Sequence, residues 1–154
     1  MTSQSVRVPS AALWLGLAGV LPFAWGALTE WSPGLSDWTT RAIGPRFAGQ
    51  YVQVFYGAVI LSFMSGVLWG FATRAEGKAA AIGYSASVVP ALWVFFFTGG
   101  GADRASVFLL IGFLGLLGLD WAFWRAGLTP PWWMRLRVLL TGLVAALLLL
   151  GLSL

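Results

Sequence analysis

The sequence of 154 residues contains neither cysteine nor histidine. Without cysteine, the chain cannot form disulfide bonds, thiolate metal sites or iron–sulfur clusters. Without histidine, it lacks the usual haem ligand, the commonest metal ligand and the commonest proton shuttle of proteins. We therefore expect no cofactor and no metal site.

Charged residues are also scarce. They make up 9% of the chain, whereas a soluble domain usually carries about 25%. Hydrophobic residues make up 59%, and the mean hydropathy is +0.85. Because so few charges cannot cover a soluble surface, most of the exterior must face lipid or protein. The net charge of +4 comes from only nine Lys and Arg, too few for a nucleic-acid-binding surface, so we expect no nucleic-acid partner.

Long apolar segments divide the chain into five stretches, each near the roughly 20 residues that span a hydrocarbon core. We expect transmembrane helices over residues 9–28, 50–72, 79–98, 105–124 and 132–154. Pro22 and Pro90 are expected to interrupt the first and third helices. A short interfacial helix over 36–43, capped by Ser36, is expected between the first two. The prediction is an all-α integral membrane protein, one domain over residues 1–154.

The first apolar segment is expected to be a retained helix rather than a signal peptide. Only Arg7 precedes it, Pro22 interrupts it, and no A-x-A cleavage motif follows it.

The distribution of basic residues predicts the orientation. Five crossings place the termini on opposite sides of the membrane. One side is expected to carry six of the nine basic residues: Arg7, Arg74, Lys78, Arg125, Arg135 and Arg137. The other side carries the remaining three: Arg41, Arg46 and Arg104. By the positive-inside rule, we expect the N-terminus on the cytoplasmic side, or on the matrix side, and the C-terminus outside, which is the periplasmic side of a bacterial inner membrane.

Two ladders of small residues run along neighbouring segments. The first consists of Ala58, Ser62, Gly66 and Gly70, and the second of Ala79, Gly83, Ser87 and Ala91. Small residues four apart line one helix face and let a second backbone approach closely. We expect both ladders to pack the second helix against the third, because a short loop makes these helices antiparallel neighbours. The alternative is a docking face for another subunit.

Asp120 is an ionisable residue within an apolar segment, which makes it a candidate functional residue. It lies near the end of its segment, close to Arg125 and across a short turn from Arg135 and Arg137. We favour an ion-pair clamp that joins the fourth and fifth helices. A proton relay and a contact with a partner protein are the alternatives. A relay usually needs several titratable groups along one path, and no other predicted segment contains Asp, Glu or His.

Polar side chains gather around the second apolar segment: Tyr51, Gln53, Tyr56, Ser62 and Ser65. We expect most of them to form hydrogen bonds between helices, and a polar pocket for a small ligand or a quinone head group is the alternative. The chain shows no nucleophile–base pair, paired catalytic carboxylates or metal-ligand set, so we do not expect an enzyme.

The run from Tyr56 to Gly70, YGAVILSFMSGVLWG, resembles the signature of a bacterial and mitochondrial membrane family that includes transmembrane protein sixty-nine. Three further pieces fit the same pattern: Gly19–Phe23, Ser87–Pro90, and Asp120 followed by Trp133–Arg137 and Thr141. Met64 and Ser65 stand where the pattern would have Leu and Gly. The resemblance covers nearly the whole chain and implies a five-helix inner-membrane protein. The family has no established activity, so the resemblance transfers no catalytic residue.

These observations favour a non-catalytic accessory, stabilising or assembly subunit of a larger inner-membrane complex, respiratory or photosynthetic. Its expected partners are membrane lipid and other membrane protein subunits. The alternative is a small polytopic transporter or channel that acts as a homo-oligomer. The proline-interrupted segments support this alternative, but the chain has no inverted repeat and few polar groups at mid-membrane.

Overall fold

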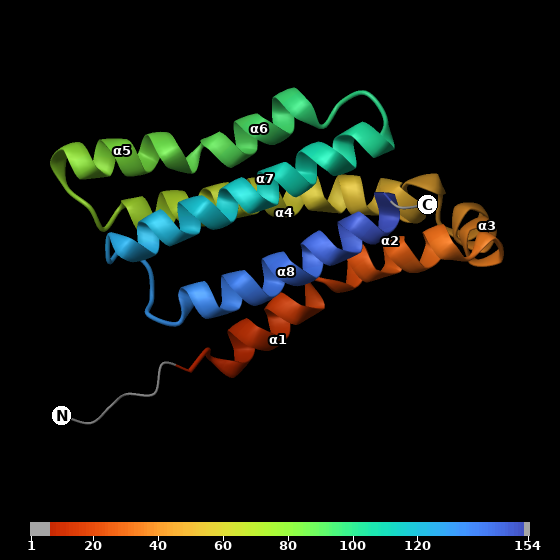
Figure 1. Cartoon of the computed structure of the whole chain (residues 1–154), viewed down its shortest axis with the longest axis horizontal. Coiled ribbons are helices and arrows are strands. Elements are labelled where there is room, and N and C mark those ends of the chain that lie inside the picture. Colours follow the sequence, from red (N-terminus) through yellow and green to blue (C-terminus); the bar gives the residue numbers. More distant parts are fainter. Residues whose placement is uncertain (1–6, 153–154) are drawn as a thin grey trace.

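A computed structural model describes residues 7–152 of the chain, which contain helices and loops but no strand. Five helical spans run along the bundle (Figure 1), and each is long and apolar enough to cross a membrane. They are α1 (Ser10–Ala18) with α2 (Leu21–Trp31), α4 (Gly49–Ala72), α5 (Gly77–Ser87) with α6 (Val89–Phe97), α7 (Ala102–Arg125) and α8 (Trp133–Leu152). The expected five-helix membrane bundle is confirmed.

Two of the spans are broken at the places where proline predicts an interruption. The first span breaks between α1 and α2, and Pro22 lies in the first turn of α2. The third span breaks between α5 and α6, and Pro90 lies in the first turn of α6. Proline has no backbone N–H and its ring clashes with the preceding turn, so a helix tends to end before it and start again.

The connection between the first two spans differs in detail from its prediction. The short helix is α3 (Pro33–Ala42), which begins three residues before the expected start, and a 3₁₀ turn (Pro45–Phe47) follows it. Ser36 therefore lies inside the helix and does not cap it. The helix starts at Pro33 because the fixed φ angle of proline suits the first helical position.

Other helix ends shift by up to three residues. The first span extends to Trp31 rather than residue 28, and α7 begins at Ala102 rather than 105. The end expected for the last helix, residue 154, lies outside the described residues.

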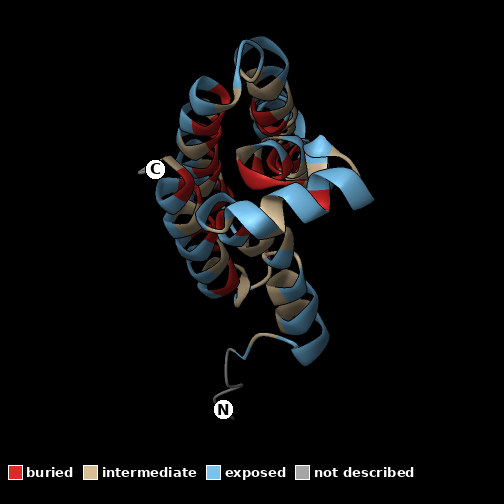
Figure 2. Cartoon of the chain, turned by 90° about the vertical axis from the view of Figure 1, so that its right-hand side faces the viewer, coloured by how far each residue is buried: buried red, intermediate tan, exposed pale blue. Residues whose placement is uncertain are grey.

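The helices form three layers, with α4 and α7 in the middle (Figure 1). The pair α5–α6 covers one side of this middle layer, and α2 and α8 cover the other. The core lies between the layers and includes these fully buried side chains: Phe23, Leu61, Leu68, Leu109 and Leu148. Figure 2 shows the buried residues on the inward sides of the helices, whereas the outward sides are exposed.

The loops gather at two opposite ends of the bundle. The described N-terminal residues, the α4–α5 loop and the α7–α8 loop lie at one end, whereas α3, the α6–α7 loop and the end of α8 lie at the other (Figure 1). This arrangement places the six basic residues grouped above at one end and the other three at the opposite end. Which end faces the cytoplasm stays a prediction.

Candidate functional site

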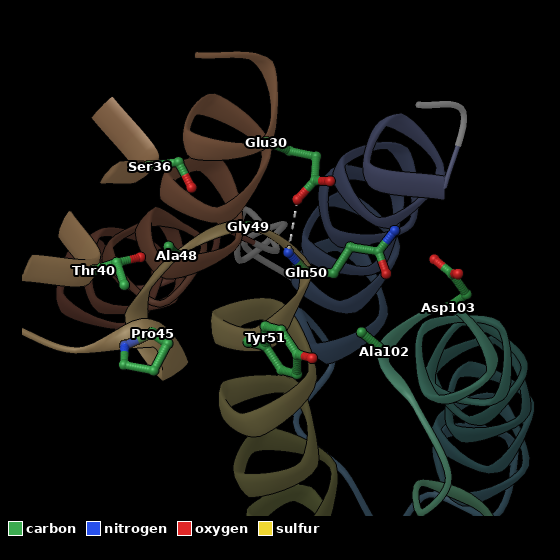
Figure 3. Close-up of a pocket in the computed structure, with 10 residues that line it drawn as sticks. All are labelled: Glu30, Ser36, Thr40, Pro45, Ala48, Gly49, Gln50, Tyr51, Ala102 and Asp103. Carbon is green, nitrogen blue, oxygen red and sulfur yellow. Dashed lines mark hydrogen bonds between the residues drawn. The ribbon is translucent and has the colours of Figure 1, made fainter. Parts of the chain in front are cut away.

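The most polar pocket lies at the end of the bundle that carries α3 (Figure 3). It has a volume of about 320 Å³, and Glu30, Tyr51 and Asp103 are among its lining residues. A carboxylate oxygen of Glu30 accepts a hydrogen bond from the backbone N–H of Gln50 at 3.1 Å. The described residues hold no group of three or more His, Cys, Asp or Glu side chains that could bind a metal ion.

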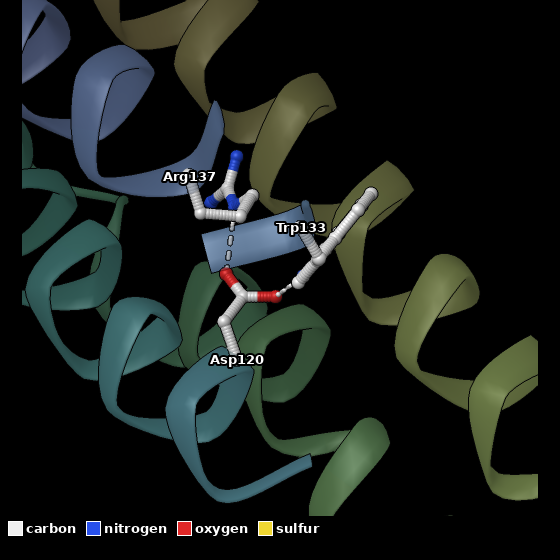
Figure 4. A network of polar contacts seen from close by, with 3 residues as sticks. All are labelled: Asp120, Trp133 and Arg137. Atoms are coloured by element: carbon white, nitrogen blue, oxygen red, sulfur yellow. Dashed lines mark hydrogen bonds and ion pairs between the residues drawn. The ribbon is translucent and has the colours of Figure 1, made fainter. Parts of the chain in front are cut away.

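The Asp120 carboxylate lies between α7 and α8, fully buried and held by two donors from α8 (Figure 4). Nε of Arg137 donates to one carboxylate oxygen at 2.6 Å, and the indole N–H of Trp133 donates to the other at 2.8 Å. Residues 133 and 137 are one helical turn apart, so both side chains lie on the same face of α8. The expected ion pair between the fourth and fifth spans is present, and each carboxylate oxygen of Asp120 accepts a hydrogen bond.

Two of the arginines expected in this clamp lie elsewhere. The guanidinium group of Arg125 lies over the Trp121 ring, 5.3 Å from its centroid. Five residues along an α-helix correspond to a rotation of about 140°, which turns Arg125 away from Asp120. Arg135 is exposed, because two residues correspond to about 200° and place it opposite Arg137 on α8. The clamp therefore consists of Asp120, Arg137 and Trp133, whose donor role the sequence analysis missed.

Only the middle of the second small-residue ladder is buried inside the bundle. Gly83 and Ser87 are buried against α4, Ala91 is half-buried, and Ala79 is exposed at the start of α5. A Cβ atom added at Gly83 would lie 3.0 Å from the Cβ of Ala72, a contact so tight that α4 and α5 would have to move apart slightly. The hydroxyl of Ser65 donates to the carbonyl oxygen of Ser87. The face of α4 that meets this ladder carries Ser65, Leu68 and Ala72.

The first ladder does not pack against α5, and its expected internal role is wrong. Ser62, Gly66 and Gly70 are exposed, and Ala58 is half-buried. A Cβ atom added at Gly66 or Gly70 would have no described atom outside its own helix within 4 Å. Ser62, Gly66 and Gly70 lie about 100°, 140° and 180° around α4 from the buried Leu61, because about 100° separates successive helical residues. We call Ser62, Gly66 and Gly70 the open face of α4.

The other polar residues around α4 divide between interior and surface. Gln53 is fully buried, and its side-chain amide donates to the carbonyl oxygens of Phe23 at 2.9 Å and of Leu147 at 3.1 Å. It therefore joins α2, α4 and α8, as expected for an interhelical hydrogen bond. Tyr51 is 55% exposed, and Tyr56 lines a second pocket.

This second pocket is a cleft of about 290 Å³ between the α1–α2 break, α4, α7 and α8. Its walls are mostly apolar, with Phe23 and Phe113 among the lining residues. Two polar side chains reach it, Tyr56 from α4 and Arg137 from α8. We call it the lateral cleft.

Comparisons with known proteins identify the family. A family model described as "Protein of unknown function (DUF3429)" matches residues 8–153. Transmembrane protein 69 of Xenopus tropicalis is 36% identical over 137 residues, and Transmembrane protein 69 of Mus musculus is 31% identical over 137 residues. Each match covers 86% of this chain, which spans about half the length of these curated relatives, 50% and 51% respectively. No solved structure matches the chain. The resemblance seen in the sequence is thereby confirmed, and the chain belongs to the DUF3429 family of proteins of unknown function.

Proposed function

We propose that this multi-pass membrane protein is a non-catalytic accessory, stabilising or assembly subunit of a larger complex in a bacterial inner membrane, respiratory or photosynthetic. The observation that carries the proposal is the open face of α4. Ser62, Gly66 and Gly70 have the four-residue spacing typical of helix contact sites in membranes, yet they are exposed. A transmembrane helix of a partner subunit would bring its backbone close to this face.

The interior of the bundle supports a structural role rather than proton transfer. Both oxygens of Asp120 accept hydrogen bonds from α8. The other acidic residues are all exposed: Glu30, Asp37, Glu76 and Asp103. A proton relay needs a succession of titratable groups across the membrane, and the described interior contains one paired carboxylate.

A transporter or channel is the second candidate, because two of the five spans are broken. Broken helices can frame a substrate site near mid-membrane. Here, however, the α1–α2 break and the α5–α6 break lie on opposite sides of the α4–α7 layer (Figure 1). The two breaks therefore do not line one common site, and the accessory-subunit proposal accounts better for the arrangement.

Substitutions on the open face test the proposal. We expect the wild-type protein, tagged at its native expression level and extracted in mild detergent, to migrate with one large complex on native gels. Gly66→Leu and Gly70→Leu fill the space that a partner helix would occupy, so both variants should lose this complex while they remain folded.

Gly142→Leu is the matched control. Gly142 is also exposed on a membrane-spanning helix, and an added Cβ atom would have no described atom outside that helix within 4 Å. This variant should keep the complex. Migration of the wild type alone, or equal behaviour of all three leucine variants, would contradict the proposed function.

A further inference from the structure

The lateral cleft opens toward the lipid because α1 is only loosely attached to the bundle. No residue of α1 is buried, and its main contact is with α8. This contact is close, since a Cβ atom added at Gly16 would lie 2.8 Å from the Leu140 side chain. Beyond the contact, the break at Gly19 leaves the cleft open between α1 and α4. Leu15 and Phe63, which are 74% and 64% exposed, are among the lining residues that face outward.

Each of the two polar side chains that line the cleft has a donor atom without a hydrogen-bond partner in the described part of the chain. Among the residues that the structure describes, Nη2 of Arg137 is buried without an acceptor. The Tyr56 hydroxyl forms no hydrogen bond with any described residue. An unsatisfied donor in a hydrocarbon environment is costly. The cleft therefore offers donors to a molecule that brings acceptors.

The charge at the cleft favours a neutral acceptor. The positive charge of Arg137 is already balanced by Asp120 through the 2.6 Å ion pair. A carboxylate or phosphate in the cleft would add a second negative charge without a second cation, which is unfavourable away from water. A carbonyl oxygen would accept hydrogen bonds from Tyr56 and Arg137 and add no charge.

The volume and lining of the cleft suit a ring-shaped ligand. Its volume of about 290 Å³ exceeds the roughly 150 Å³ of a cavity that holds benzene. Phe23 packs edge-to-face against Tyr56 and Phe113, with ring centroids 5.4 and 5.9 Å apart. All three are among the lining residues, so the inner side of the cleft is aromatic, although Phe23 and Phe113 themselves are almost fully buried.

We propose that the lateral cleft binds the ring of a lipid-soluble quinone, whose carbonyl oxygens accept hydrogen bonds from Tyr56 and Arg137 and whose apolar tail lies in the bilayer. The absence of cysteine and histidine does not oppose this ligand, because a non-covalently bound quinone needs neither. The inference is independent of the docking role of the open face.

Quenching of intrinsic tryptophan fluorescence by a benzoquinone with a ten-carbon tail tests the inference on the full-length protein in detergent. We expect saturable quenching by the wild type. Tyr56→Phe removes one donor, so its Kd should rise about two- to tenfold, the range that one hydrogen bond typically contributes. Ile60→Phe places extra volume in the cleft and should raise Kd by at least about tenfold.

Two control variants separate the cleft from general effects. Tyr84→Phe removes a half-buried tyrosine hydroxyl outside the cleft, and Ile111→Phe fills an apolar crevice beside α6 instead. Both should bind like the wild type, and all four variants should keep melting temperatures close to that of the wild type. Non-saturable quenching, or equal Kd values for Tyr56→Phe and Tyr84→Phe, would overturn the proposal.

Competition distinguishes a quinone from a membrane lipid. Neither dioleoylglycerol, which carries neutral ester carbonyls, nor dioleoyl phosphatidylglycerol, which is anionic, should displace the quinone at equimolar concentration. Displacement by the neutral lipid would show that the cleft binds a lipid ester instead. Displacement by the anionic lipid would contradict the claim that the cleft prefers a neutral acceptor. Either result would overturn the assignment to a quinone.

Discussion

At the residue scale, the clamp of Asp120, Arg137 and Trp133 joins the two helices that hold it. Its ion pair could be predicted in part, because a lone carboxylate in an apolar segment needs a cation nearby. The choice of Arg137 over Arg125 and Arg135 depends on the angular position of each arginine around its helix. This position follows from residue spacing once the helix has been predicted. The Trp133 donor was missed, although its four-residue spacing from Arg137 was visible.

Removal of the Asp120 carboxylate should destabilise the protein strongly. Asp120→Ala leaves the buried Arg137 charge unpaired, and breaking a buried pair on one side typically costs about 3–5 kcal/mol. The double substitution Asp120→Leu with Arg137→Met removes both charges and should recover much of this loss. Thermal unfolding in detergent measures the effect.

Asp103→Ala is the control, since Asp103 lies on the same helix but is exposed. Its effect should stay within about 0.5 kcal/mol, as is usual for surface substitutions. If Asp120→Ala and Asp103→Ala unfolded at the same temperature, the clamp would not contribute to the stability of the protein.

At the element scale, the sequence predicts helix breaks better than helix neighbours. Pro22 and Pro90 act on their own backbone, so the two breaks follow from local chemistry alone. The partner of a small-residue ladder depends on how helices pack in three dimensions. Gly83 and Gly66 belong to equivalent patterns, yet Gly83 meets Ala72 while Gly66 faces outward.

This difference predicts a loss of stability for a larger residue at Gly83 and no change for one at Gly66. Gly83→Leu would force α5 away from Ala72, and overpacking of this kind typically costs about 1–3 kcal/mol. Gly66→Leu adds its side chain to open space and should leave the isolated protein as stable as the wild type. Thermal unfolding of the two purified variants checks this, and equal destabilisation would show that the open face is covered within the chain.

At the scale of the whole molecule, hydropathy was sufficient to predict five spans, and the first and last described residues lie at opposite ends of the bundle. The basic residues follow the same division, with Arg74 and Lys78 at one end and Arg41 and Arg46 at the other. The lateral cleft could not be predicted, because it depends on where α1 leaves the bundle after its break. The open face of α4 is also a property of the whole bundle, since α4 contacts helices of all three layers and still exposes one side.

Site-specific photo-cross-linking in native membranes tests the docking role of this open side most directly. Val59 lies within about 20° of Gly66 around α4 and is 62% exposed, whereas Val138 on α8 is 56% exposed. With benzoylphenylalanine at each position in turn, we predict one discrete adduct with a different membrane protein from position 59 and none from position 138. Lipid adducts alone at both positions, or an adduct of twice the chain's own mass, would contradict the account.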